Sequence, residues 1–343
     1  MHFLITGHTG FKGAWLSMLL QSLGHTVAGY SVGFEKNSLY ELLRGQQLFK
    51  NEKFEDIRDL ANFTSFLSSE NPDVLVHFAA QSLVRESHRN PEETFEVNVI
   101  GTLNCLQVAR SVNKDLICLV ITTDKVYKSL SELRMFVEED PLEGSEPYGR
   151  SKAIADLATN FWMSNGLLNH LAIARAGNVI GGGDVCPERL LPDLIAAYSE
   201  GRSPVLRSPT AVRPWQHVLD CLNGYLTIVN NLANGGASDV WNIGPDLNSH
   251  ATVKRVQEIT GALFKQTDVT ISQVPDNLPE TQFLGLNSEK IRTRLGWSNI
   301  YDLPEAIERT VTWHSKVDAG MSPFLVSIGQ IEEFLGRIST KDS

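Results

Sequence analysis

The chain opens with Phe3-Leu4-Ile5-Thr6-Gly7-His8-Thr9-Gly10-Phe11-Lys12-Gly13, an apolar run that passes directly into glycines at GxxGxxG spacing. Apolar residues at helical spacing follow as far as Leu23, and Gly24 then stands where a helix commonly ends. Glycines at a strand–helix junction let the backbone turn tightly and approach a phosphate, while the first helical turn supplies unpaired N–H donors. The pattern therefore predicts a strand, a dinucleotide-binding loop and a helix, which together begin a Rossmann unit.

The rest of the first half repeats this alternation. Short apolar runs typical of parallel strands covered on both faces lie at 26–30, 74–78, 116–121 and 171–174. After Arg175, glycine and proline become frequent and the alternation stops. The sequence predicts an α/β protein with a doubly wound parallel Rossmann sheet in residues 1–177 and a smaller C-terminal substrate-capping subdomain in 178–343. The run 240–244 is expected to return to the sheet, and the chain beyond about residue 337 is expected to fray.

Composition narrows the classes of function. The 343 residues carry a formal net charge of -10, with 42% hydrophobic and 20% charged residues, which is ordinary for a globular protein. Because an acidic chain lacks the basic face that nucleic acids require, we expect no nucleic-acid partner. No run of about 18 uncharged apolar residues exists, and Gly7 leaves no room for a leader peptide, so we expect a cytoplasmic protein without a membrane partner. The four scattered cysteines lack metal spacing, so we expect reduced thiols and no metal.

The residues expected to bind the nucleotide are less standard. The second strand ends in Tyr30-Ser31-Val32, without the acidic residue that usually accepts from the ribose hydroxyls and without an arginine cluster for a 2′-phosphate. We therefore expect NAD rather than NADP. Asp56 and Ile57, after the third strand, fit a contact with the adenine edge; the alternative is an ordinary polar cap after a strand.

A Tyr-x3-Lys motif supplies the first catalytic candidates. Tyr148-Gly149-Arg150-Ser151-Lys152 places a phenol and an ammonium four residues apart, on one face of a helix. The ammonium is expected to lower the pKa of the phenol from about 10, so that a phenolate takes a hydroxyl proton while hydride leaves for the nicotinamide. Thr122 and Thr123 end the preceding strand, and both hydroxyls are expected to bind the same reacting oxygen.

Several longer segments resemble the extended short-chain dehydrogenase/reductase superfamily, and within it the CDP-glucose 4,6-dehydratases, over essentially the whole chain. These segments are GHTGFKGAWL (7–16), HFAAQSLVRES (77–87), VNVIGT (97–102), TTDKVY (122–127), PYGRSK (147–152), RAGNVIGGGD (175–184), AVRPWQHVLD (211–220) and LGW (295–297).

The resemblance implies roles for individual residues. It implies a catalytic triad of Thr123, Tyr148 and Lys152, joined by Asn98, and an acid/base pair of Asp124 and Lys125. The substrate diphosphate is expected at Asn178, Arg189 and Arg213. Together with the glycine loop, the resemblance places NAD at Gly7, Thr9, Gly10, Phe11, Gly13, Asp56, Ile57, Ala79, Ala80, Asn98, Thr122, Tyr148 and Lys152. Structural alternatives stay open: a solvated charge pair for Asp124 and Lys125, a helix-bending or strand-tethering side chain for Asn98, and a salt bridge for Arg213.

The implied reaction explains these residue types. Oxidation of the sugar at C4 acidifies the C5 proton, a base removes that proton, an acid protonates the departing C6 hydroxyl, and NADH returns hydride to C6. Asp124 suits the acid if burial raises its pKa, and Lys125 suits the base only if its pKa falls below about 10.4. The expected product is CDP-4-dehydro-6-deoxy-glucose.

Departures from the pattern keep alternatives open. Gly149 stands where these dehydratases usually have serine, and Pro279-Glu280-Thr281 stands where His-Glu-Ala is expected. The alternatives are a 4,6-dehydratase for another nucleotide sugar, a nucleotide-sugar epimerase or decarboxylase, and a non-catalytic NAD-binding protein. The resemblance also implies a homodimer or homotetramer, formed through helices near 96–110 and 148–162.

Overall fold

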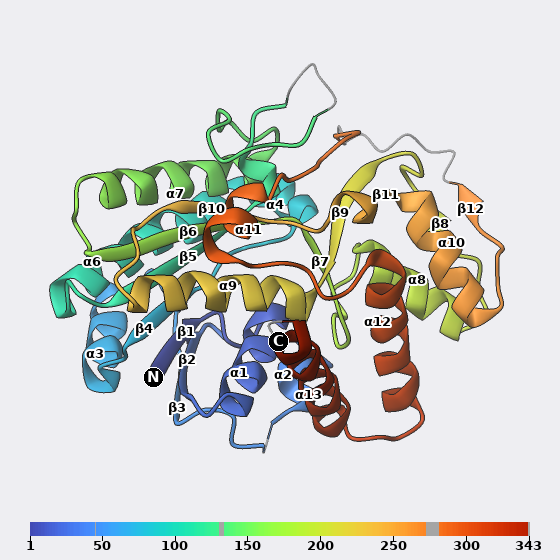
Figure 1. Ribbon diagram of the computed structural model, residues 1–343, viewed down its shortest axis with the longest axis horizontal. Coiled ribbons are helices and arrows are strands. Elements are labelled where there is room, and N and C mark those ends of the chain that lie inside the picture. The colour runs from blue at the N-terminus through green and yellow to red at the C-terminus, as the bar shows by residue number, and fades with distance from the viewer. Residues whose placement is uncertain (45, 130–133, 272–280, 342–343) are drawn as a thin grey trace.

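A parallel seven-stranded sheet forms the centre of the molecule (Figure 1), seen in a computed structural model that describes residues 1–44, 46–129, 134–271 and 281–341. Every neighbouring pair of strands within it is parallel. In spatial order the strands are β10 (Val240–Ile243), β6 (His170–Ala176), β5 (Ile117–Thr123), β4 (Val74–His77), β1 (His2–Thr6), β2 (Thr26–Ser31) and β3 (Asn51–Phe54). The predicted Rossmann sheet is confirmed, including the return of the chain through β10.

Alternation along each strand builds two cores, one on each face of the sheet. Phe3 and Ile5 of β1 join the core that contains Trp15, whereas Leu4 joins the core that contains Leu75. The first face is covered by α1 (Phe11–Ser22) and α9 (Val218–Ala233), and the second by α3 (Leu60–Glu70), α6 (Gly101–Val112) and α7 (Pro147–Ser164). Because the strand order reverses between β1 and β4, the loops after these two strands diverge, which is where doubly wound sheets bind ligands.

The second half of the chain adds smaller elements at one end of the sheet. They are β7 (Asn178–Ile180), β9 (Val212–His217) and β11 (His250–Thr252) in one sheet, β8 (Val205–Leu206) paired with β12 (Thr270–Ile271), and helices α8 (Leu190–Ser199), α10 (Val253–Phe264), α11 (Glu289–Leu295) and α12 (Leu303–Asp318). Figure 1 shows α8, α10 and α12 gathered to the right of the central sheet. Since α9 and β10 lie on and in the central sheet, the chain crosses between the two parts more than once. The boundary at residue 177 stays a prediction.

The expected fraying beyond residue 337 is wrong as far as Lys341. Helix α13 (Pro323–Lys341) packs against α1 and buries Ile331 and Phe334. Lys341 Nζ then donates to Ser298 Oγ at 2.8 Å and to the Asn299 carbonyl at 3.1 Å. An apolar stripe and a terminal lysine therefore hold the last helix in place. Among the described residues, no helix combines the length and apolar character needed to cross a bilayer.

The remaining helical segments are short. They are α2 (Leu39–Leu42), α4 (Val84–Arg89), α5 (Pro91–Phe95), the π-helix η1 (Glu96–Ile100), and the 3-10 turns η2 (Asp124–Val126) and η3 (Leu247–Ser249).

Candidate active site

The glycine loop lies where β1 meets α1, against the end of β4. Gly7 has φ +73°, and a Cβ there would lie 2.8 Å from the Ala79 nitrogen. A Cβ on Gly13 would lie 2.5 Å from the Gly7 carbonyl oxygen. Helix α1 begins after Gly10 without a side-chain cap, so its first-turn N–H groups have no side-chain acceptor. The loop is thus a tight cradle of backbone that only glycines permit.

Other residues of the loop motif fasten it to its surroundings. The Thr9 hydroxyl hydrogen-bonds with Ser31 Oγ at 2.9 Å and donates to the Gly33 carbonyl, which ties the loop to the end of β2. Phe11 lies against the later glycine segment, where a Cβ on Gly181 would come within 3.1 Å of the Phe11 ring. Direct contact of these two side chains with the cofactor stays a prediction.

Asp56, predicted to contact the adenine, is paired with Arg58, to which sequence reasoning gave no role. Arg58 Nη2 lies 2.6 Å from Asp56 Oδ2, and Arg58 Nη1 donates to Glu96 Oε2 at 2.9 Å. Hydrogen bonds from Arg58 lower the pKa of Asp56, so this carboxylate stays ionised. Ile57 is buried and fills the space beside Gly101. The Asp56 carboxylate is paired with an arginine, and contact of Asp56 and Ile57 with a cofactor stays a prediction.

Asn98 occupies the π-helical turn η1 and is fully buried. Its Oδ1 accepts from the Gln81 N–H at 2.8 Å, and its Nδ2 donates to the Gln81 carbonyl at 2.9 Å and to Ser151 Oγ at 2.9 Å. The amide therefore clamps the loop after β4, near Ala79 and Ala80, to the helix that carries the Tyr-x3-Lys motif. This geometry supports the tethering alternative.

Helix α7 brings the Tyr-x3-Lys pair to the end of β5. Lys152 Nζ donates to the Ile121 carbonyl at 2.7 Å, and the Tyr148 side chain hydrogen-bonds with that of Thr123. The triad of Thr123, Tyr148 and Lys152 thus meets at one strand end. Burial lowers the pKa of Lys152 to about 8, and the nearby charge of Lys12 acts in the same direction.

Two expectations need correction, one for the pKa of Tyr148 and one for the hydroxyl groups of Thr122 and Thr123. Burial raises the pKa of Tyr148, and among the causes the Thr123 hydrogen bond, not Lys152, provides the main opposing effect. Burial therefore outweighs the lowering of the Tyr148 pKa that was expected from the Lys152 ammonium, which donates to the Ile121 carbonyl. The pairing of the Thr122 and Thr123 hydroxyls is wrong as well: Thr122 donates to Asp156 Oδ2 at 2.9 Å. Successive strand residues point to opposite faces, so one oxygen cannot receive both hydroxyls.

Asp124 and Lys125 form the turn η2 directly after β5. Thr123 Oγ1 donates to Asp124 Oδ1 at 3.0 Å, while Asp124 Oδ2 is buried and has no hydrogen-bond partner among the described residues. Burial raises the pKa of Asp124, and the charge of Lys125 opposes the rise. The raised pKa is the property that an acid at this position needs.

Gly149 explains how closely this turn approaches α7. A Cβ at Gly149 would lie 2.6 Å from the Lys125 carbonyl oxygen and 3.3 Å from the Lys125 Cβ. The serine expected from the resemblance would push the two segments apart. Of the other departure, Pro279 and Glu280 lie outside the described residues.

The two predicted diphosphate arginines act electrostatically on the catalytic groups. Arg189 precedes α8, pairs with Asp184 at 2.9 Å, and its charge favours the ionised form of Tyr148. Arg213 on β9 is 4% exposed, and its charge opposes the raised pKa of Asp124. Asn178 on β7 lies opposite Trp215 of β9, two residues beyond Arg213. The structure thus brings both arginines near the catalytic residues, and their contact with a diphosphate stays a prediction.

Sequence reasoning gave no role to Lys12, which lies partly buried near Lys152 of the triad. Its Nζ donates to Tyr225 OH at 3.2 Å and lies 5.6 Å from the centroids of the Phe78 and Tyr225 rings. Burial lowers the pKa of Lys12. The sequence offered one indication of a role for Lys12: it lies between the second and third glycines of the loop and is the second residue of α1. Within the described ranges, no group of three or more His, Cys, Asp or Glu side chains is arranged to hold a metal ion.

The doubly wound sheet, the glycine cradle and the Thr-Tyr-Lys triad define the class of this chain: a Rossmann-type enzyme of the short-chain dehydrogenase/reductase kind. The sequence profile of the GDP-mannose 4,6 dehydratase family matches residues 4–310, and the chain belongs to that family. It is 33% identical to a CDP-glucose 4,6-dehydratase of Salmonella typhimurium, over 96% of this chain and 95% of the relative.

Solved structures agree with this assignment. A dTDP-glucose 4,6-dehydratase of Streptomyces venezuelae, solved with NAD bound, superposes with a TM-score of 0.82 at 26% identity, covering 94% of this chain and 100% of the other. A dTDP-glucose 4,6-dehydratase of Bacillus anthracis in complex with NAD gives a TM-score of 0.81 at 26% identity, covering 94% and 99%.

Proposed function

We propose that this chain is an NAD-dependent nucleotide-sugar 4,6-dehydratase that converts CDP-glucose to CDP-4-dehydro-6-deoxy-glucose. The observation that carries the proposal is Asp124. This carboxyl group is buried, has a raised pKa and keeps one oxygen that has no partner in the described part of the chain, directly beside Lys125. An epimerase has no need for a proton donor of this kind, because it leaves the C6 hydroxyl in place.

The cradle around Gly7 and Ala79 fits a dinucleotide, since a single Cβ would fill it. The residues that would hold the cofactor are those of the glycine loop, with Ala79, Ala80 and the Tyr148–Lys152 pair. When bound, NAD accepts a hydride from the sugar and later returns it. The acidic groups around Arg58 favour NAD over NADP, because they repel a 2′-phosphate.

The chain's own residues divide the proton transfers. Tyr148 takes the proton of the C4 hydroxyl, and Thr123 holds the phenol in place through its hydrogen bond to it. Asp124, whose pKa is raised by burial, donates a proton to the departing C6 hydroxyl. Lys125 takes the C5 proton. Arg189, Arg213 and Asn178 would bind the diphosphate, where guanidinium groups suit phosphate oxygens.

The direct test of this function is product analysis. The protein is incubated with NAD and with CDP-, dTDP-, GDP- and UDP-glucose, and products are identified by mass and NMR. We expect loss of water from CDP-glucose, with turnover at least about tenfold faster than with the other nucleotides. A product with unchanged mass would mean epimerisation.

We further propose that the chain is a cytoplasmic homodimer, with a homotetramer as the alternative. Leu157 and Phe161 of α7 are 51% and 62% exposed, and Ile154 and Ile100 beside them are exposed as well. Apolar side chains spaced along one helix face without cover suit a partner helix. Light scattering of the wild type and of Phe161→Arg tests this proposal, with the variant expected to lower the molecular mass.

A further inference from the structure

Three consecutive residues of β5 are each held by a different side chain of α7. The carbonyl of residue 121 accepts from Lys152 Nζ at 2.7 Å, the hydroxyl of residue 122 donates to Asp156 Oδ2 at 2.9 Å, and the hydroxyl of residue 123 bonds with Tyr148. Residues 148, 152 and 156 repeat at intervals of four, so they share one face of the helix. The register of α7 on β5 is therefore fixed at the catalytic residues themselves.

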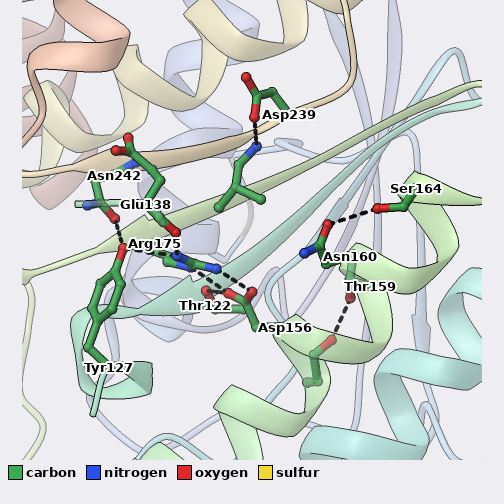
Figure 2. A network of polar contacts seen from close by, with 12 residues as sticks. Thr122, Tyr127, Glu138, Asp156, Thr159, Asn160, Ser164, Arg175, Asp239 and Asn242 are labelled. Carbon is green, nitrogen blue, oxygen red and sulfur yellow. Dashed lines mark hydrogen bonds and ion pairs between the residues drawn. The ribbon is translucent and has the colours of Figure 1, made fainter. Parts of the chain in front are cut away.

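Arg175 on β6 extends this contact to the elimination turn. Its guanidinium forms a bidentate pair with Asp156, at 2.7 and 2.9 Å, and both side chains are almost completely buried. Its remaining Nη1 donates to Tyr127 OH at 3.0 Å and to the Glu138 carbonyl at 2.8 Å, and Tyr127 OH donates to Asn242 Oδ1 at 2.6 Å. Figure 2 shows Arg175 at the centre, with Asp156 and Thr122 on one side and Tyr127 and Asn242 on the other.

The connected residues belong to the two halves of the chemistry. Asp156 lies one helical turn beyond Lys152, on the oxidation side, and Tyr127 lies two residues beyond Lys125, on the elimination side. Resting on the function proposed above, we propose that Asp156 and Arg175 are positioning residues that fix these two halves relative to each other, and that Asp156 keeps the Lys152 ammonium charged. Neither residue contacts the reacting atoms.

Stability alone is a weak reason for such a pair. A buried ion pair often contributes no more to stability than well-packed apolar residues of similar volume, because both charges lose their hydration. Thr122, Tyr127 and Glu138 each hydrogen-bond to one member of this pair, which itself joins α7 to β6. The geometry favours orientation of the site as its role.

The charges around Lys152 make the second part of the proposal testable. They are Lys12 from α1, Asp156 from α7 and, behind Asp156, Arg175 from β6; His77 of β4 is held neutral, since burial lowers its pKa to about 3. Lys12 lowers the pKa of Lys152 and Asp156 raises it. A charged Lys152 favours the Tyr148 phenolate, so the rate should fall as pH rises through the pKa of Lys152.

The experiment measures the first hydride transfer, as NADH absorbance in a single turnover, across pH 6 to 10 (about the range that spans the Lys152 titration). In wild type, the rate should fall at high pH, and we call this fall the alkaline limb. Asp156→Asn removes the negative charge and leaves Arg175, so the alkaline limb should move to lower pH by about one unit. Arg175→Met leaves the negative charge, so its limb should not move to lower pH. Asp156→Glu keeps the charge and should keep the wild-type limb with a reduced rate.

A matched control separates this effect from general destabilisation. Asp220 is another buried aspartate, and it accepts from the Ile300 and Tyr301 N–H groups, away from the triad. Asp220→Asn should lower the melting temperature without moving the alkaline limb. If Asp156→Asn leaves the limb in place, or if Asp156→Asn and Arg175→Met both move it to lower pH, the proposal is overturned.

Tyr127→Phe tests the link to the elimination side and serves if the Asp156 variants do not fold. It removes the hydroxyl that joins Arg175 to Asn242 and leaves the Asp156 pair in place. We expect NADH formation within about twofold of wild type and dehydration slowed about tenfold. Equal slowing of both steps would contradict the coupling. A wild-type protein that forms neither NADH nor dehydrated product would instead contradict the proposed function.

Discussion

The oxidation half and the elimination half of this site are held in different ways. Lys152 and Asp156 on α7 have their polar atoms satisfied by β5 and Arg175 before any substrate arrives. Asp124, only one residue past Thr123, keeps a buried oxygen for which the described residues offer no partner. Buried polar atoms in folded proteins nearly always have partners, so an unpartnered one at this place points to a bond that the substrate completes.

The contrast separates structure-supported positioning from substrate-dependent chemistry. The redox residues are preorganised by the fold, as stabilisation of a transition state requires. Burial raises the pKa of Asp124, the proposed acid, and its unpartnered oxygen is expected to find a partner in the substrate. Substitutions on the oxidation side should therefore block the first hydride transfer, whereas substitutions on the elimination side should block only the loss of water.

The largest effect is expected from Tyr148→Phe. The variant keeps the ring and removes the hydroxyl that we propose takes the C4 proton, so turnover should fall by about two to four orders of magnitude. NAD binding, measured by calorimetry, should stay within about threefold of wild type. Retention of more than about a tenth of the activity would show that another group is the base.

On the elimination side, Asp124→Asn and Lys125→Met should spare the first step and block the second. Each variant should form NADH and then stall, with 6-deoxy product formed about 100-fold or more slowly. Lys128→Met is the matched control, because Lys128 is exposed and paired only with Glu143 at 2.9 Å in the described chain. Normal turnover of both elimination variants would make the Asp124–Lys125 pair an ordinary charge pair.

Cofactor preference should show a smaller difference. NAD should bind about tenfold or more tightly than NADP, because Arg58 is already bonded to Asp56 and Glu96 and cannot receive a 2′-phosphate without leaving them. Calorimetry with both dinucleotides measures this. Equal affinity would show that Arg58 changes partner.

The smallest effect concerns stability. The pKa of Asp124 is raised by burial, so the folded chain holds this proton more tightly than the unfolded chain does. Stability is therefore lost as pH rises from the unfolded to the folded pKa, and the full cost is present above the folded pKa. Asp124→Asn removes the cost, so its melting temperature should exceed that of wild type by about 2 °C at pH 8 (a change of roughly 1 kcal/mol). The difference should shrink as pH falls, and a variant that melts below wild type at high pH would contradict the buried-acid assignment.

Much of the fold could be predicted from local patterns. The strand runs, the glycine loop and the helix ending at Gly24 depend on residues near one another in sequence, and the structure has them where they were expected. The return of 240–244 to the sheet was predicted for the same reason, since a continuous apolar run suits a covered strand.

The wrong predictions concern properties that depend on burial and on the direction in which a side chain points. Spacing placed Lys152 beside Tyr148, but it contains no measure of burial, which raises the phenol's pKa. Thr122 was paired with Thr123 because both are hydroxyls, whereas strand alternation directs Thr122 to Asp156. Asp156 and Arg175 lie 19 residues apart and meet only when β6 pairs with β5 and α7 covers both. No short motif contains that information.

Deuterium labelling tests directly whether this site eliminates water from the sugar. The wild-type protein is incubated with NAD and CDP-glucose in D₂O, and in a parallel sample with C4-deuterated CDP-glucose in H₂O. We predict a 4-dehydro-6-deoxy product that carries solvent deuterium at C5 in the first sample and the C4 deuterium at C6 in the second. A product that keeps its C6 hydroxyl, with no solvent deuterium at C5, would contradict the account and identify an epimerase.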